Sequence, residues 1–217
     1  MSYFKYPSKI AVTFPDAPIS ELNLDWDYMM MHNGYWGCNC YMYNYAQNHE
    51  MIAVLMRQLG QIAQSDYTKS NGTETFTSKT RDTLKKLGLS VSDISDYKPG
   101  KTADIADGII LMRGDCLGKN NKLEGHIWII DGVKRFVSIH KCYVRENSGQ
   151  KWTVMNESKD ILHFNHINWG WYGNQDGWFN DGVFNALIPV EYSYNNQDTG
   201  IDSPNFTMNL KYFVVYK

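Results

Sequence analysis

The hydrophobic pattern of this chain changes near residue 108, from the spacing of helices to that of β-strands. Apolar residues recur every three or four positions over Asn44–Gln64, which predicts a helix there. A second helix is predicted over Phe76–Leu87, because Gly88 follows it in the place of a C-terminal cap. After Gly108, aromatic and β-branched residues gather in short runs that are typical of strands. The expected strands are Ile109–Met112, Ile127–Ile130, Arg135–Arg145, Trp152–Met155, Leu162–Trp169, Trp178–Phe184 and Phe206–Tyr216.

This order of elements predicts an α+β protein made of a single domain over residues 1–217. Residues 1–107 should form a mainly helical half, and residues 108–217 a mainly β half built on an antiparallel sheet. A cleft between two such halves is a common place for a binding site, so we expect the chemistry there.

Charge and apolar run length exclude several classes of protein. The chain has 21 Lys and Arg against 23 Asp and Glu, a net charge of −2, so no bulk charge draws it to nucleic acid or to an anionic membrane. The longest purely apolar run, Met51–Met56, is far shorter than the ~20 residues of a membrane-spanning helix. The N-terminus has no basic start followed by an apolar stretch, so it is not a signal peptide. The four cysteines are too few for a disulfide framework and do not decide the compartment.

His126 is the first residue whose position points to catalysis. Gly125 precedes it, an apolar run over Ile127–Ile130 follows, and Asp131-Gly132 predicts a turn at the end of that run. An imidazole at the mouth of a strand suits a general base, because its pKa lies near neutrality. A histidine that merely begins a strand explains the same pattern.

Asn168 and Trp169 stand in a dense aromatic run, Asn168–Trp171. An asparagine can orient a catalytic imidazole, and an indole can shield that hydrogen bond from water. An aromatic hairpin in the core, or a platform of exposed indoles that stacks on sugars, explains the run as well. Together with His126, the run fits a Cys-His-Asn peptidase site whose thiol sits at a helix N-terminus in the first half, where the helix dipole lowers the thiol pKa.

Four blocks of the chain resemble the streptopain family of papain-like cysteine peptidases, which bacteria secrete as proenzymes. His166–Phe179 is similar to that family's His-x-Asn-Trp-Gly-Trp-Gly-Gly-x-x-Asp-Gly-aromatic-Phe signature, and Gly125–Gly132 to the segment around its catalytic histidine. Leu24–Met29 and Val54–Gly60 resemble two further blocks, and all four keep the family order.

The resemblance implies a papain-like fold and cysteine endopeptidase activity. By this resemblance, His126 is the catalytic base, Asn168 orients it and Trp169 is part of its shield. Thr77, Ser78 and Gly125 are expected to line the substrate cleft, although a helix cap explains Thr77 or Ser78 equally well. The stretch between His126 and Asn168 is longer than in streptopain, and its excess, Val133–Leu162, predicts an added pair of strands.

The nucleophile of the family has no counterpart in this chain. In the family a Gly-Cys pair opens a helix that leads to a Tyr-Pro, which matches Tyr6-Pro7 here, so the catalytic cysteine would lie before Met1. We therefore expect a chain truncated just after that cysteine, and inactive as it stands. The four cysteines present lie in an aromatic loop, in the loop Gly114–Glu124 and in a predicted strand, where no helix N-terminus activates a thiol; they are Cys38, Cys40, Cys116 and Cys142.

The expected partners are protein or peptide substrates and a propeptide or propeptide-like inhibitor, with no nucleic acid. The full-length parent is expected to be secreted or on the cell surface. A groove left by the missing helix would favour self-association. Two alternatives stay open: a natural pseudopeptidase that binds peptides or such an inhibitor, and a carbohydrate-binding or adhesive module that uses Trp36, Trp171 and Trp178. No cofactor or metal is expected, because the histidines and cysteines form no four-ligand set.

Overall fold

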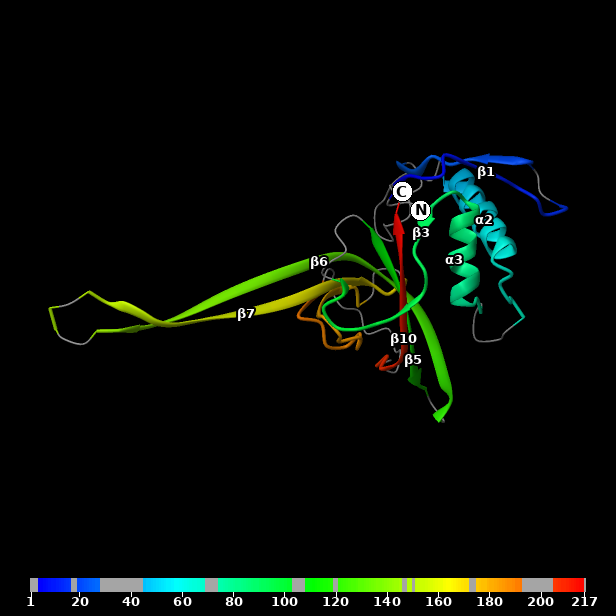
Figure 1. The fold of residues 1–217 in the computed structure, drawn as a ribbon. Helices are drawn as coiled ribbons and strands as arrows, with labels where there is room; N and C mark the ends of the chain where they lie inside the picture. The colour runs from blue at the N-terminus through cyan, green and yellow to red at the C-terminus, as the bar shows by residue number, and fades with distance from the viewer. Residues whose placement is uncertain are drawn as a thin grey trace. The chain divides into compact units, whose positions relative to one another are not determined.

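The chain divides into two compact units, Met1–Ile94 with Phe213–Lys217, and Ser95–Tyr212. The structure is a computed structural model, and it describes residues 4–16, 19–27, 45–68, 74–102, 108–118, 121–145, 148–149, 151–171, 175–192 and 205–216 (Figure 1). Each unit has a hydrophobic core of its own. The cleft expected between a helical and a β half stays a prediction.

The first unit contains two helices and a small sheet. Helix α2 spans Tyr45–Ile62 and helix α3 spans Thr77–Lys86, which confirms both predicted helices to within two residues. Strands β1 (Lys9–Ala11) and β2 (Glu21–Asn23) pair antiparallel; at three residues each, they are too short to show a periodicity in the sequence. The core of this unit is made of Ile10, Val12, Phe14, Leu22, Leu24, Trp26, Val54 and Leu55.

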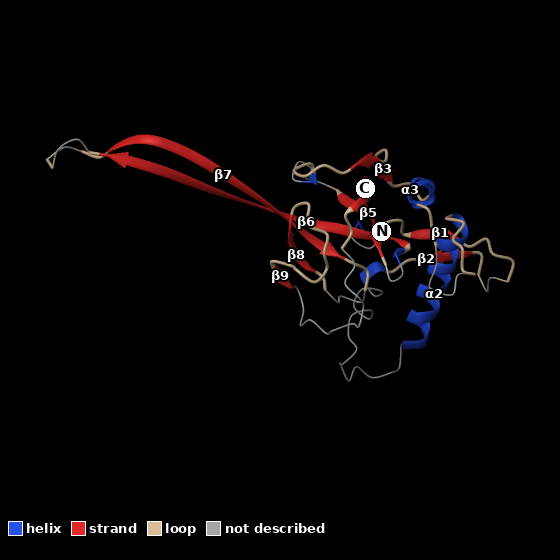
Figure 2. Cartoon of the chain, turned by 90° about the horizontal axis from the view of Figure 1, so that it is seen from below, coloured by secondary structure: helices blue, strands red, loops and turns tan. Residues whose placement is uncertain are grey.

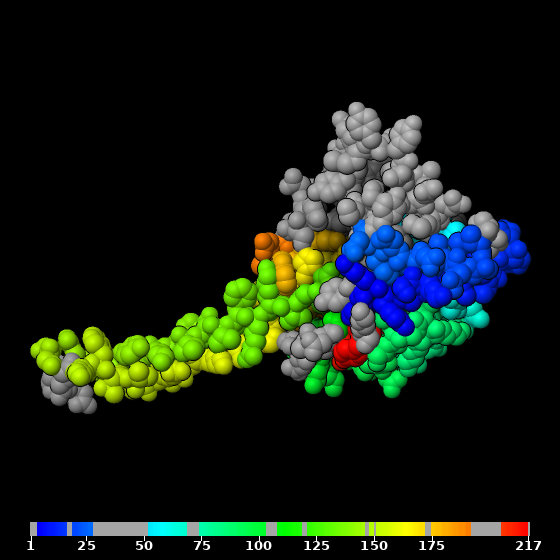
Figure 3. Space-filling model, turned by 90° about the horizontal axis from the view of Figure 1, so that it is seen from above, coloured from blue at the N-terminus to red at the C-terminus, as the bar shows by residue number. Residues whose placement is uncertain are grey.

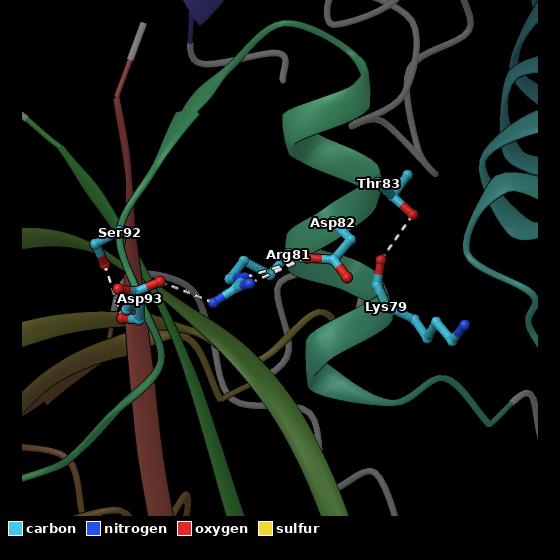
Figure 4. Close-up of polar contacts among 6 residues, drawn as sticks. All are labelled: Lys79, Arg81, Asp82, Thr83, Ser92 and Asp93. Atoms are coloured by element: carbon cyan, nitrogen blue, oxygen red, sulfur yellow. Dashed lines mark hydrogen bonds and ion pairs between the residues drawn. The ribbon is translucent and has the colours of Figure 1, made fainter.

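Helix α3 is tied to the strand that follows it by an arginine. Arg81 Nη1 lies 3.1 Å from Asp93 Oδ1, just after β3 (Ser90–Val91), and Arg81 Nη2 lies 3.3 Å from Asp82 Oδ1 (Figure 4). Both acidic partners are exposed, so each pair stabilises the unit only weakly. At the end of the helix, Gly88 has a φ of 86°, the left-handed conformation in which glycine ends helices, as predicted.

The second unit is built on a twisted antiparallel sheet (Figure 2). Its order is β3-β10-β5-β6-β7-β8-β9, and β4 also pairs with β10, which runs through both units. The strand bounds are β4 Ser95–Asp96, β5 Ile109–Leu117, β6 Leu123–Val144, β7 Thr153–Asn168, β8 Gly177–Asn180, β9 Glu191–Tyr192 and β10 Met208–Tyr216. Helices before the sheet confirm the predicted α+β order.

Strands β6 and β7 each join two strands that were predicted separately. Asp131-Gly132, predicted to be a turn, instead lies inside β6, at an irregularity of register between Ile130 and Gly132; the predicted turn is wrong. A Cβ on Gly132 would lie 3.1 Å from Trp178 and from His166 Cβ, so the glycine permits close packing there. Val133–Leu162 does form the predicted added strand pair, a long hairpin that extends from the rest of the sheet (Figure 1).

One carboxylate joins three segments of the second unit. Asp181, after β8, accepts hydrogen bonds from the Tyr97 hydroxyl at 2.5 Å, Thr102 Oγ1 at 3.0 Å and Asn165 Nδ2 at 2.7 Å. Its second oxygen accepts the N–H of Gly100. Burial raises the pKa of Tyr97, and the bond to Asp181 raises it further, so the phenol stays a donor. This network anchors the segment before β5 to the sheet.

No helix in the described part of the chain is long and apolar enough to cross a membrane.

Candidate active site

His126 lies on β6, opposite Gly114 of β5, and its ring is packed between aromatic side chains of the same unit. Trp171 stacks on it with ring centroids 5.0 Å apart and an interplanar angle of 28°. Phe206 stacks at 5.6 Å, and Trp128, its neighbour on the same face of β6, lies at 6.3 Å. These rings hold the imidazole in one plane and exclude water from much of it.

One nitrogen of His126 is oriented by the main chain. His126 Nε2 lies 2.8 Å from the carbonyl oxygen of Trp169. A carbonyl only accepts hydrogen bonds, so in the neutral imidazole Nε2 carries the proton and Nδ1 carries the lone pair. Nδ1 makes no hydrogen bond with the described residues and is therefore the basic nitrogen.

The environment keeps His126 neutral at neutral pH. Burial lowers its pKa below the usual value, and the hydrogen bond to Trp169 opposes this only in part. A neutral imidazole with an unshared Nδ1 pair can accept a proton from a nucleophile, which is the role of a general base.

Trp169 positions His126 through its backbone rather than through its ring. Its N–H donates to Asp176 Oδ1 at 2.8 Å while its carbonyl accepts from His126. The indole is fully buried; it stacks on Trp171 at 5.5 Å and 13°, so it backs the ring that covers His126. Burial raises the pKa of Asp176, and the Trp169 N–H opposes that rise. Trp171 thus contacts the His126 ring and Trp169 lies behind Trp171, and the role of Trp169 as a shield stays a prediction.

Asn168 makes no hydrogen bond to the imidazole among the described residues. Asn168 Oδ1 accepts the N–H of Gly170 at 2.9 Å, a local turn that occupies the oxygen expected to orient His126. The carbonyl of the next residue, Trp169, takes that place. No contact supports the role of Asn168 as the orienting residue, which stays a prediction.

Of the three predicted substrate-lining residues, Thr77 and Ser78 belong to the first unit and Gly125 belongs to the second. Thr77 and Ser78 begin α3, but the N-cap of this helix is Phe76 and has no side-chain cap, so the alternative prediction that either of them caps the helix is wrong. The Thr77 hydroxyl is buried without a hydrogen-bond partner in the described structure. A cavity of about 660 Å³ borders α2 and α3, and neither Thr77 nor Ser78 lines it. Gly125 is exposed on β6, beside the Arg113–Asp115 ion pair, and a Cβ there would lie 2.8 Å from Asp115 Oδ1.

Neither of the two described cysteines has the environment of a nucleophile. Cys116 lies in β5, not in the loop predicted for it, and is buried. The register puts it on the face of the sheet that carries His126, two residue pairs further along. Burial raises the pKa of its thiol, and the charges of Glu124 and Asp115 raise it further, which disfavours the thiolate. Cys142 is exposed on the hairpin, and Cys38 and Cys40 lie outside the described residues.

Two residues around His126 are not predicted from the sequence to contact it. Trp171 stands in the aromatic run and is named only for the carbohydrate alternative, so its sequence signal is present. Phe206, 80 positions after His126, has no sequence signal, because only the pairing of β10 with β5 carries the chain back to this place. Within the part of the chain that the structure describes, no group of three or more His, Cys, Asp or Glu residues could hold a metal ion.

A family model, the Peptidase C10 family, matches residues 1–179. The chain belongs to the Peptidase C10 family. This is the streptopain family, so the family resemblance is confirmed, and C10 proteins are cysteine peptidases.

A solved structure agrees with the C10 assignment at the level of the fold. The structure of active wild-type interpain A, a cysteine protease of Prevotella intermedia, matches with a TM-score of 0.54 and 19% identity. The match covers 100% of this chain and 79% of that one. At this identity it shows the papain-like fold alone. No curated protein sequence matches the chain significantly.

A pH titration of stability tests the environment of His126 in this C10 chain. Because the folded pKa of His126 is lowered, the folded state binds fewer protons than the unfolded state below pH 6.5. The stability that His126 contributes is therefore present above pH 6.5 and is lost as the pH falls. We expect the free energy of unfolding of the wild type, minus that of His126→Gln, to decrease from about pH 7.5 to about pH 5.5 in urea titrations.

His166→Gln is the matched control for that titration, because the contribution of His166 to stability changes with pH in the opposite direction. His166 Nδ1 lies 2.5 Å from Asp131 Oδ1, and this hydrogen bond raises the pKa of His166, against the effect of burial. Its contribution to stability is present below pH 6.5 and is lost as the pH rises. Equal slopes for the two variants would contradict the buried, neutral state inferred for His126.

Proposed function

We propose that this chain carries the general-base half of a cysteine endopeptidase site. Nδ1 of His126 takes the proton of a cysteine thiol, the thiolate attacks a peptide carbonyl, and His126 returns the proton to the leaving amine. The observation that carries this proposal is the hydrogen bond of His126 Nε2 to the Trp169 carbonyl, because it leaves Nδ1 as the basic nitrogen. Family membership supplies the reaction class.

The nucleophile in this proposal is a cysteine other than Cys116 or Cys142. The raised thiol pKa of Cys116 argues against the first, and the position of Cys142 on the hairpin, away from His126 in the register, argues against the second. The sequence places Cys38 and Cys40 in an aromatic loop rather than at a helix start, so we expect none of the four cysteines to be the nucleophile and the 217-residue chain alone to be inactive. The substrates are proteins or peptides, and a propeptide-like inhibitor would occupy the same site. On family grounds we also propose that the protein is secreted or on the cell surface.

The test is a variant extended at its N-terminus by a helix that opens with Gly-Cys, as in the family. An epoxysuccinyl inhibitor should label the added cysteine, and casein should be hydrolysed. His126→Ala should lower hydrolysis by about 10²–10⁴-fold, the usual contribution of a general base. Cys116→Ser and Cys142→Ser in the extended chain should leave both signals unchanged.

Two results would overturn the proposal. One is full activity of the extended chain without His126. The other is labelling of Cys116 in the unextended chain together with proteolysis, because that would identify a different nucleophile.

A pseudopeptidase that binds peptides without cleaving them is the second candidate. The turn that occupies the Asn168 side chain favours it, since the amide does not orient the base. An extended chain that binds peptides by calorimetry but hydrolyses none would support this candidate. The carbohydrate module gains no support: Trp171 stacks on His126 and Trp169, Trp178 packs on His166 and under the Lys134 ammonium, and Trp36 lies outside the described residues.

A further inference from the structure

The β6–β7 hairpin, Val133–Leu162, projects from the sheet of the second unit as a two-stranded arm (Figure 3). At about 3.3 Å per residue, its strands extend roughly 40 Å, from Val133 to Val144. A hairpin of two strands is only marginally stable in water by itself, since it buries little apolar surface. A surface that covers its exposed apolar side chains would therefore stabilise the arm.

The arm is basic although the chain is not. Residues 133–162 contain six Lys and Arg against three Asp and Glu, a net charge of +3, so the remaining residues carry −5. Over a length of several Debye lengths, the end of the arm is screened from the charge of the rest of its unit. The net charge of the whole chain, −2, does not show that positive charge is concentrated in the arm.

The register of the hairpin sorts its side chains into two unlike faces. One face, here called the apolar face, carries six exposed or half-buried apolar side chains: Val133, Val137, Ile139, Tyr143, Val154 and Ile161. It also carries Arg135, Lys141 and Lys159, of which Lys141 pairs with Glu157 at 3.1 Å. The opposite face carries Phe136, Leu162 and Phe164 near the sheet and Val144 at the distal end, with small polar residues and the His140–Asp160 pair between them.

The distal end of the arm combines large apolar side chains with cations. Tyr143 is 50% exposed, Trp152 63% and Met155 73%. Arg145 lies over the Trp152 ring, 5.0 Å from its centroid, and Lys151 is exposed beside it in sequence. Trp and Tyr with flanking Arg and Lys are the side chains that favour the interface of a bilayer, where one end of each is apolar and the other wet.

Charge and shape favour a membrane over another protein. A second copy would bring two arms of +3 together, which opposes self-pairing. A stable protein interface buries about 800 Å² per partner against a complementary surface, whereas a narrow projecting arm offers less. A bilayer accommodates such an arm without a preformed pocket, and anionic headgroups attract each nearby cation.

We propose that the β6–β7 hairpin binds the surface of an anionic lipid bilayer, through its apolar face and its distal end, Tyr143–Arg145 and Lys151–Met155. The indole of Trp152 and the phenol of Tyr143 enter the headgroup region, and the Lys and Arg side chains contact lipid phosphates. The arm thereby attaches the chain to a membrane without a spanning helix.

The test is co-sedimentation of the 217-residue chain with vesicles. This experiment needs no peptidase activity, so its result does not depend on the proposed function. The chain should bind phosphatidylcholine vesicles that contain phosphatidylglycerol, bind pure phosphatidylcholine vesicles weakly, and lose binding as salt rises. Tyr143→Ser with Trp152→Ser should weaken binding about tenfold or more. Arg145→Glu with Lys151→Glu should weaken it by roughly the same factor.

Matched variants separate the proposed surface from general effects. Phe136→Ser with Leu162→Ser removes as many apolar side chains from the opposite face and should bind as the wild type does, whereas Val137→Ser with Ile139→Ser should bind more weakly. Lys98→Glu with Lys101→Glu makes the same change of net charge at exposed positions before β5 and should have little effect. Unchanged far-UV circular dichroism confirms folding.

Three outcomes would overturn the proposal. The first is a wild type that does not sediment with anionic vesicles. The second is equal weakening by the variants of both faces. The third is a concentration-dependent dimer without lipid that the apolar-face variants abolish, because that would make a second copy the partner of the arm.

Discussion

Trp169→Ala is expected to lower the free energy of unfolding by about 3–5 kcal/mol, the usual loss when a large aromatic side chain is removed from a core. Trp169 is fully buried, and its ring contacts Trp128, Trp171, Phe179 and Phe206 at centroid distances of 5.2–5.8 Å. Since domains are stable by only about 5–15 kcal/mol, the variant should be close to unfolding at physiological temperature. Urea unfolding followed by far-UV circular dichroism measures this without relying on the indole that is removed.

Trp152→Ala is the matched control, because it removes the same side chain from an exposed position on the hairpin. It should change the free energy of unfolding by less than about 0.5 kcal/mol. Trp169→Phe keeps an aromatic ring in the core, so its free energy of unfolding should lie between those of Trp169→Ala and Trp152→Ala. The buried indole nitrogen of Trp169 has no hydrogen-bond partner in the described structure, so Phe loses no polar contact there. Equal midpoints for Trp169→Ala and Trp152→Ala would show that this packing is wrong.

Asp181→Ala is expected to lower the free energy of unfolding by about 2–4 kcal/mol. The carboxylate accepts bonds from Tyr97, Thr102 and Asn165, and Ala leaves these donors without their acceptor in a region from which water is largely excluded. The loss of a charged acceptor is worse than the loss of a neutral one, because charge-assisted hydrogen bonds are the stronger ones. Urea unfolding again provides the measurement.

Asp160→Ala is the control for Asp181→Ala. Asp160 also accepts a contact from a neighbour, His140 at 3.2 Å, but its side chain is 70% exposed, so its removal should change stability by less than about 0.5 kcal/mol. Tyr97→Phe removes one of the donors and should lose less than Asp181→Ala, about 1 kcal/mol. If Asp181→Ala proved as stable as Asp160→Ala, the segment before β5 would not depend on this network.

Local patterns in the sequence predicted the helices correctly, because the residues that define a helix are close together in the sequence. The three-and-four spacing in α2, and Gly88 after α3, follow from helix geometry, and the structure confirms both helices. Asp131-Gly132 misled the prediction because such a pair commonly forms a turn. Here Trp178 and His166 of the neighbouring strands pack against Gly132, and the strand continues through it. Pairing with β7 outweighed the local preference.

For the site, the order of motifs along the chain identified the candidate residues, but it did not predict which of them contact one another. His126 and the Asn168–Trp171 run were found from residue types and from their likeness to a family, and the C10 match confirms that family. Which group orients the imidazole depends on where the chain turns after β7. The turn directs the Asn168 oxygen to Gly170 and the Trp169 carbonyl to His126, and no residue pattern distinguishes these two acceptors.

The α+β order, the peptidase family and the candidate base can be predicted from the sequence alone, because they depend on periodicity and on motifs that are short in sequence. Three features could be seen only in the folded chain: Phe206 and Trp171 enclose His126, burial raises the thiol pKa of Cys116, and one face of the added strand pair combines apolar and basic side chains. Each of these depends on strand register and burial, which arise when residues distant in the sequence pair in one sheet.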